Sequence, residues 1–82
     1  MYEGWHVEFS DHAKRRMAER SVDEAEVFRT LADPETVSPD VPTGKLLTRY
    51  LEDWDRILVV AIEERPRAGV ILVKTVLWSK AS

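Results

Sequence analysis

The sequence contains no cysteine and only two histidines, and these shortages restrict the chemistry open to the chain. Without cysteine there is no disulfide, no thiolate zinc site and no cysteine nucleophile. His6 and His12 match no metal-binding spacing such as HExxH, so we expect neither a metal nor a cofactor. No stretch approaches the roughly 18 to 20 apolar residues of a membrane span, and the first ten residues lack a leader pattern. We therefore expect a cytoplasmic protein without a membrane partner.

Length and composition indicate one folding unit. The chain has 82 residues, of which 44% are hydrophobic and 33% charged, which predicts a single domain over residues 1–82. A core of this size gives modest stability, so a second chain can contribute. The sequence leaves open whether the protein is a homodimer.

Two helices are predicted after a short first strand. Trp5, Val7 and Phe9 alternate with polar residues, which is typical of an edge strand. Ser10 can cap a helix that runs from Asp11 to about Arg20. A second helix is predicted to begin with a capping box at residues 21–24 and to end at residues 33–34, where a proline follows an aspartate.

The remainder of the chain predicts strands joined by short links. Residues 36–44 are rich in proline and are interpreted as a loop, with a brief strand over residues 35–38 as the alternative. Three strands follow, at Lys45–Glu52, Arg56–Glu63 and Val70–Trp78. The predicted fold is α+β: a short N-terminal strand, two helices, then a three- to four-stranded antiparallel β-meander with the helix pair on one face.

Charge is distributed unevenly along the chain. The net charge is −3, and residues 22–40, which contain six acidic side chains and one arginine, carry a net charge of −5. A basic surface elsewhere is compatible with this balance, although net acidity disfavours tight nonspecific binding of nucleic acid.

The stretch HAKRRMAER at residues 12–20 is the most distinctive feature. His12, Arg16 and Arg20 recur every four residues, so their side chains share one side of a helix. Guanidinium groups bind phosphate bidentately, and an imidazole exchanges protons near neutral pH. The alternative is a solvated helix face in which Arg15 pairs with Glu19.

Several residues of the predicted sheet are further candidates. Lys74 and Thr75 interrupt an apolar strand, and strict alternation would send them to opposite faces. Arg49 and Arg56 lie on or near the central strands and could bind phosphate beside an exposed aromatic side chain such as Tyr50, a pattern used for single-stranded RNA. Core packing explains the aromatic side chains equally well.

These segments together resemble a known family. SDHA at residues 10–13, RMAERSV at residues 16–22, DRILVV at residues 55–60 and VKTV at residues 73–76 resemble the DUF4258 family. This group of small proteins is thought to be related to RelE-like toxins and to the wider barnase, EndoU, colicin and RelE ribonuclease superfamily. One departure is Ser21, where the family usually has glycine after the Glu-Arg pair; a different turn there would affect the placement of Arg20.

The resemblance implies a RelE-like fold and metal-independent cleavage of RNA by a toxin-like endoribonuclease. It points to His12, Arg20 and Thr75 as catalytic residues, joined by Arg16, and to Arg56. Together with Arg56, the candidates Arg49 and Lys74 named above from their places on the sheet are expected to bind the substrate. The implied partners are RNA, free or on the ribosome, and an antitoxin protein. The alternative is a non-enzymatic protein-binding module, or an inactive relative of the RelE-like fold.

Overall fold

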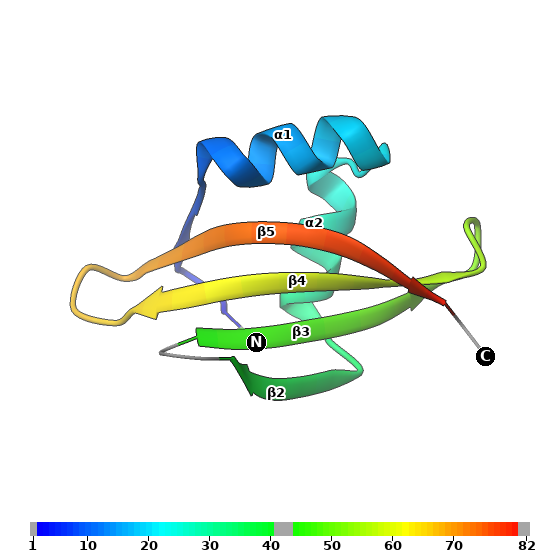
Figure 1. The fold of residues 1–82 in the computed structure, drawn as a ribbon. Coiled ribbons are helices and arrows are strands. Elements are labelled where there is room, and N and C mark those ends of the chain that lie inside the picture. Colours follow the sequence, from blue (N-terminus) through cyan, green and yellow to red (C-terminus); the bar gives the residue numbers. More distant parts are fainter. Residues whose placement is uncertain (1, 41–43, 81–82) are drawn as a thin grey trace.

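The computed structural model describes residues 2–40 and 44–80, which form two helices and one five-stranded sheet (Figure 1). The sheet order is β1-β5-β4-β3-β2. The combination of two helices with one sheet confirms the predicted α+β class. In chain order the elements are β1 (His6–Phe9), α1 (Asp11–Arg20), α2 (Glu24–Ala32), β2 (Thr36–Asp40), β3 (Gly44–Leu51), β4 (Arg56–Arg65) and β5 (Val70–Lys80).

The sheet is larger than the three or four strands predicted, and it is mixed. Strands β2 to β5 form antiparallel pairs, as the short links indicated, while β1 pairs with β5 in parallel. The prediction of a loop was wrong for Thr36–Asp40, which pairs with β3, as the alternative of a brief strand over residues 35–38 indicated in part. Residues 41–43 of that predicted loop lie outside the described residues. Pro39 fits there because β2 is an edge strand, whose outer side needs no hydrogen-bond partner.

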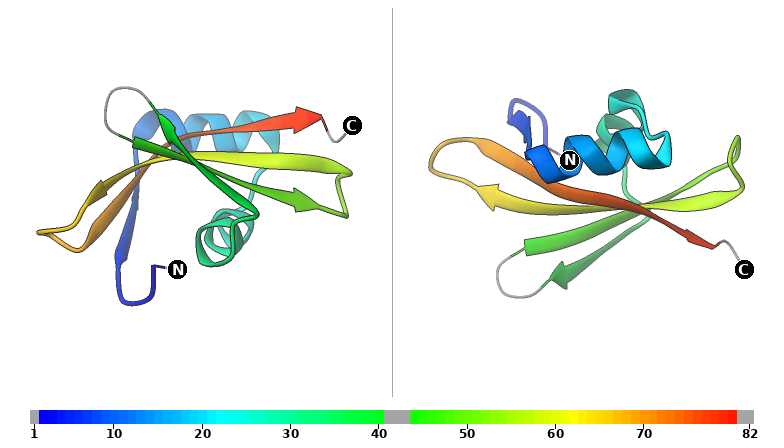
Figure 2. Two further views of the ribbon diagram at one scale, coloured as in Figure 1. Left: turned by 90° about the horizontal axis from the view of Figure 1, so that it is seen from below. Right: turned by 45° about the horizontal axis from the view of Figure 1, so that its top comes forward.

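The core lies between the helices and one face of the sheet. Helix α2 covers this face, and α1 runs along the edge of the sheet beside β5 (Figures 1 and 2). The apolar stripe of α1, formed by Ala13 and Met17, is buried. We call the face opposite α2 the open face. The buried cluster consists of Ala13, Met17, Val22, Val27, Leu31, Leu47, Leu51, Leu58, Val60, Ile62, Ile71, Val73 and Val76.

The turn between the helices differs from the predicted capping box. Ser21 ends α1 with φ 55° and ψ 46°, a left-handed conformation, and its N–H bonds back to the last turn of the helix. Helix α2 therefore begins later, at Glu24, with Asp23 as its N-cap. Glu26 Oε1 accepts a hydrogen bond from the Asp23 backbone N–H at 2.9 Å. Ser21 thus adopts a conformation that favours glycine, the residue that the resemblance implies at this position.

Strand β5 contains a β-bulge at Lys74. Thr75 pairs with Ala61 and Val73 pairs with Ile62, so that Lys74 has no partner on β4. Val73 and Val76 are both buried in the core, although strict alternation would put them on opposite faces. The extra residue resets the alternation, and Lys74 and Thr75 both lie toward the open face. The prediction that these two side chains point to opposite faces was therefore wrong.

Candidate functional site

Helix α1 continues the edge of the sheet where β1 stops. The Ser10 backbone N–H donates to the Val73 carbonyl at 3.0 Å, and at the other end of the helix Arg20 Nη1 donates to the Val76 carbonyl at 2.5 Å. Trp78 Nε1 donates a hydrogen bond to the Arg20 carbonyl at 2.9 Å. Helix α1 therefore runs parallel to β5 and occupies carbonyl groups that an exposed edge strand would leave open.

The packing of α1 decides where its cationic row faces. Ala13 and Met17 point into the core, and helical periodicity puts His12 and Arg16 on one adjacent flank. Because the helix is right-handed and runs parallel to β5, that flank turns toward the open face, the side on which Thr75 lies. We call the group formed by His12, Arg16, Arg20 and Thr75 the α1–β5 seam.

The basic side chains of the seam differ in the hydrogen bonds and ion pairs that they already form. The Arg16 guanidinium is 2.6 Å from Glu19 Oε1, so Glu19 pairs with Arg16 and not with Arg15 as the solvated-face interpretation had it. Both side chains are substantially exposed, at 37% and 49%, so this ion pair is weak. Arg20 is half-buried and bound to the Val76 carbonyl, but its guanidinium has further N–H donors. His12 is exposed and forms no hydrogen bond with the described residues.

The Lys74 side chain points away from the seam, although Lys74 directly precedes Thr75 in the sequence. Its ammonium group reaches across the open face to Asp40 Oδ2 on β2, at 3.4 Å. A Cβ atom at Gly44 would lie 2.7 Å from Lys74 Nζ, so glycine at this position leaves room for the side chain. Lys74 is therefore paired with Asp40 at a distance from α1, and the carboxylate balances its positive charge.

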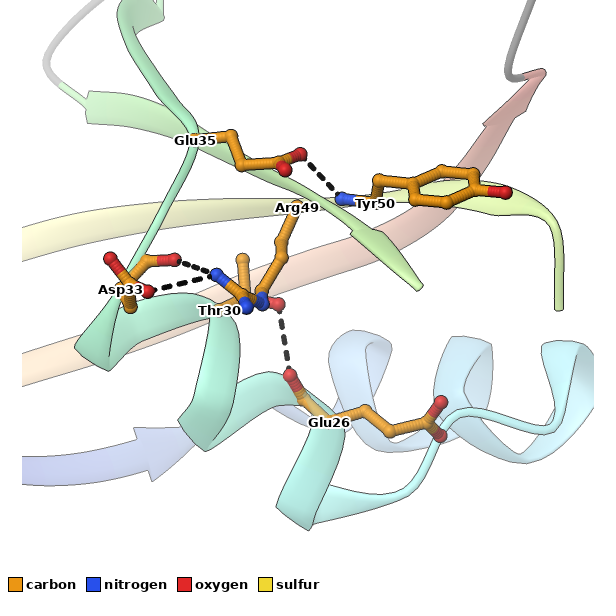
Figure 3. Close-up of polar contacts among 6 residues, drawn as sticks. All are labelled: Glu26, Thr30, Asp33, Glu35, Arg49 and Tyr50. Carbon is orange, nitrogen blue, oxygen red and sulfur yellow. Dashed lines mark hydrogen bonds and ion pairs between the residues drawn. The ribbon is translucent and has the colours of Figure 1, made fainter. Parts of the chain in front are cut away.

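Arg49 lies in a different part of the molecule from the seam. Its Nη1 donates to the Asp33 carbonyl at 2.6 Å and to Asp33 Oδ2 at 3.1 Å, at the end of α2 (Figure 3). It lines a hollow of about 370 Å³ whose carboxylates include Glu26 and Glu35. Glu35 Oε1 also accepts the Tyr50 backbone N–H at 2.7 Å (Figure 3). Such an acidic lining is unfavourable for phosphate, and the structure does not bring Arg49 together with His12.

Two further residues lie near the β3–β4 turn. Arg56 is exposed at the end of the β4–β5 ladder, whereas Thr75 pairs with Ala61 near its middle. The Tyr50 hydroxyl donates to Asp55 Oδ1 at 2.5 Å, and this bond raises the pKa of Tyr50. Arg56 and Tyr50 are thus separated from the seam along the sheet.

Ser10 makes a second contact beside the candidate site that the sequence did not indicate. The expected cap is present, because Ser10 Oγ accepts the Ala13 backbone N–H at 3.0 Å. The same hydroxyl donates to the Lys74 carbonyl at 3.0 Å. That second bond connects residues 64 positions apart, and nothing in the local pattern SDHA indicates it.

In residues 2–40 and 44–80 no helix has the length and apolar character needed to cross a membrane. Within the same residues, no three metal-ligating side chains gather into a metal site.

Comparison with known proteins gives one match. No curated protein and no solved structure matches the chain. The family model described as "Domain of unknown function (DUF4258)" matches residues 9–78. This match spans both helices, strands β2 to β4 and most of β5, and the chain belongs to the DUF4258 family.

Proposed function

We propose that the protein is a RelE-like, metal-independent endoribonuclease whose active site is the α1–β5 seam. The observation that carries this proposal is the bulge at Lys74, which turns Thr75 toward the side of the sheet that the His12–Arg16 flank of α1 faces. A proton-transfer group, two guanidinium groups and a hydroxyl then line one surface. This set suits a phosphodiester substrate.

In the proposed reaction, His12 takes the proton of an RNA 2′-hydroxyl. The 2′ oxygen forms a bond to phosphorus while the bond from phosphorus to the 5′ oxygen breaks, which leaves a 2′,3′-cyclic phosphate. Arg16 and Arg20 stabilise the charge that develops on the phosphate oxygens, and Thr75 orients the phosphate. The departing 5′ oxygen takes a proton from solvent.

The electrostatics of the chain support RNA binding at the seam better than elsewhere. Ion pairing between Arg16 and Glu19 is exposed, so a phosphate can replace the carboxylate at little cost. Lys74 lies on the same open face but is paired with Asp40, so the cations of the seam are those of α1. RNA, alone or on the ribosome, is therefore the proposed substrate, and an antitoxin the proposed regulatory partner.

A cleavage assay tests the proposal. A mixed RNA substrate is incubated with the protein in excess EDTA, with and without ribosomes. We expect cleavage by the wild type and loss of at least about a hundredfold in rate for His12→Ala, since a general base contributes roughly 10² to 10⁴. His6→Ala is the matched control, because His6 is also exposed but lies on β1, and it is expected to cleave like the wild type.

Two results would overturn the proposal. One is equal cleavage by the wild type and His12→Ala, which would mean that the activity lies elsewhere or in a contaminant. The other is no cleavage under any condition, together with normal growth of cells that express the protein.

A second candidate function is a protein-binding module. Phe28 is 44% exposed beside a hollow of about 420 Å³ that Tyr2 and Trp5 also line. Leu77 is 37% exposed on the open face. Exposed apolar surface of this kind is typical of sites that bind other proteins. Absence of RNA cleavage, combined with recovery of one specific partner, would favour this function.

A further inference from the structure

We propose that Ser10 is a positioning residue that holds Thr75 and His12 in register across the seam. The inference rests on the proposed function and deepens it, by naming what sets the geometry of that site. Ser10 stands between β1 and α1, and it contacts the bulge of β5 directly.

The bulge creates a backbone group that regular pairing would not satisfy. In an ordinary strand, successive carbonyl groups point to opposite sides. Here the carbonyls of Val73 and Lys74 both bond to Ser10, the first through its backbone N–H and the second through its hydroxyl, each at 3.0 Å. Ser10 therefore supplies the hydrogen bond that the carbonyl of the extra residue needs.

The same hydroxyl also fixes the beginning of α1. Ser10 Oγ accepts the Ala13 backbone N–H at 3.0 Å, while it donates to the Lys74 carbonyl. One oxygen atom thus connects the first turn of the helix that carries His12 to the residue directly before Thr75. Movement of either element relative to the other would stretch one of the two bonds.

The two bonds can be separated by substitution. Threonine at this position keeps a hydroxyl that both accepts and donates. Aspartate is as good a helix N-cap as serine, but its ionised carboxylate has no hydrogen to donate to the Lys74 carbonyl. Glycine is also a tolerated N-cap and has no side chain to donate. Ser10→Asp and Ser10→Gly therefore remove the bond to the bulge while they preserve most of the helix cap.

The experiment compares these variants as full-length chains in the EDTA-resistant RNA cleavage assay, with thermal unfolding measured on the same preparations. We expect Ser10→Thr to retain wild-type kcat and KM. Ser10→Asp should lose at least about tenfold in kcat with KM changed less than about twofold, because misplacement by about 1 Å can cost a hundredfold. Ser10→Gly should show the same loss, which separates the missing donor from the added charge.

A purely structural role would give a different pattern. It would lower the Tm of each variant and reduce activity only through the unfolded fraction, with kcat per folded molecule unchanged. That result, or wild-type kcat in both Ser10→Asp and Ser10→Gly, would overturn the positioning role while the proposed ribonuclease stands. Failure of the ribonuclease proposal is recognised separately, because wild type and Ser10→Thr would then both be inactive.

Discussion

Some residues of this protein adopt a backbone conformation that their residue type does not predict, and Ser21 is one of them. Ser21 adopts a left-handed backbone that costs an L-residue about 1 to 2 kcal/mol. It is exposed, and its backbone N–H closes the last turn of α1. The chain therefore keeps the turn geometry that glycine would give, at the expense of local strain.

Replacement of Ser21 by glycine should stabilise the protein. The free energy gained by relieving the left-handed conformation exceeds the free energy lost through the added entropy of a glycine in the unfolded chain. We therefore expect a gain of about 0.5 to 1 kcal/mol in the free energy of unfolding. Urea denaturation measures it. Ser38→Gly is the control: Ser38 is exposed on extended β2, and there the same substitution should destabilise by a similar amount. A loss of stability for Ser21→Gly would contradict the strain argument.

At the scale of elements, β3 and β4 are linked by an ion pair as well as by backbone bonds. Lys45 Nζ lies 2.9 Å from Glu64 Oε1, and this contact lowers the pKa of Glu64. A carboxyl group whose pKa is lowered in the folded state stabilises the fold above its unfolded pKa. That contribution is lost as the pH falls through the folded pKa.

The pH dependence of the stability of a Glu64→Gln variant follows from the lowered pKa of Glu64 in the folded state. At pH 7 we expect a loss of less than about 1 kcal/mol, because Lys45 is 40% exposed and solvent weakens the pair. The difference from the wild type should shrink below the ordinary Glu pKa of 4.5 and disappear in stronger acid. Urea unfolding at a series of pH values tests this. Glu63→Gln, whose partner Arg65 is 3.4 Å away and 54% exposed, should cost less at pH 7.

The molecule as a whole depends on one buried core shared by both helices and strands β3, β4 and β5. Leu47 is completely buried, with helix residues on one side and neighbouring strands beside it. Leu47→Ala should therefore lower the free energy of unfolding by about 2 to 5 kcal/mol and should melt helix and sheet together. Far-UV and near-UV circular dichroism record the two signals. Leu77→Ala, at an exposed position on β5, should cost less than about 1 kcal/mol, and separate transitions would argue against a single cooperative unit.

Most elements could be predicted from the sequence, because their signals are local. The apolar runs at β4 and β5 and the spacing of apolar residues in the two helices are signals that extend over only a few neighbouring residues. The parallel pairing of β1 with β5 could not be predicted, because it joins the two ends of the described chain. Strand β2 was predicted only as a brief alternative to a loop, because its proline disfavours a central strand although it is tolerated at an edge.

The candidate site was only partly predictable for the same reason. Helical spacing correctly grouped His12 and Arg16 on α1. No local signal showed that Arg20 binds the carbonyl of Val76, or that Arg49 binds Asp33. The bulge at Lys74 depends on the partner strand and on Ser10, so a rule of strict alternation failed there.

The pairing of the first strand with the last also governs when the protein can fold. While the chain emerges from the ribosome, β1 and α1 are made first but have no β5 to lie against until residues 70–80 are synthesised. Contacts between residues so far apart slow folding, since a long loop must close before they form. The His12–Arg16 flank and Thr75 therefore cannot meet on a nascent chain, and any activity of the seam begins only after β5 has left the ribosome.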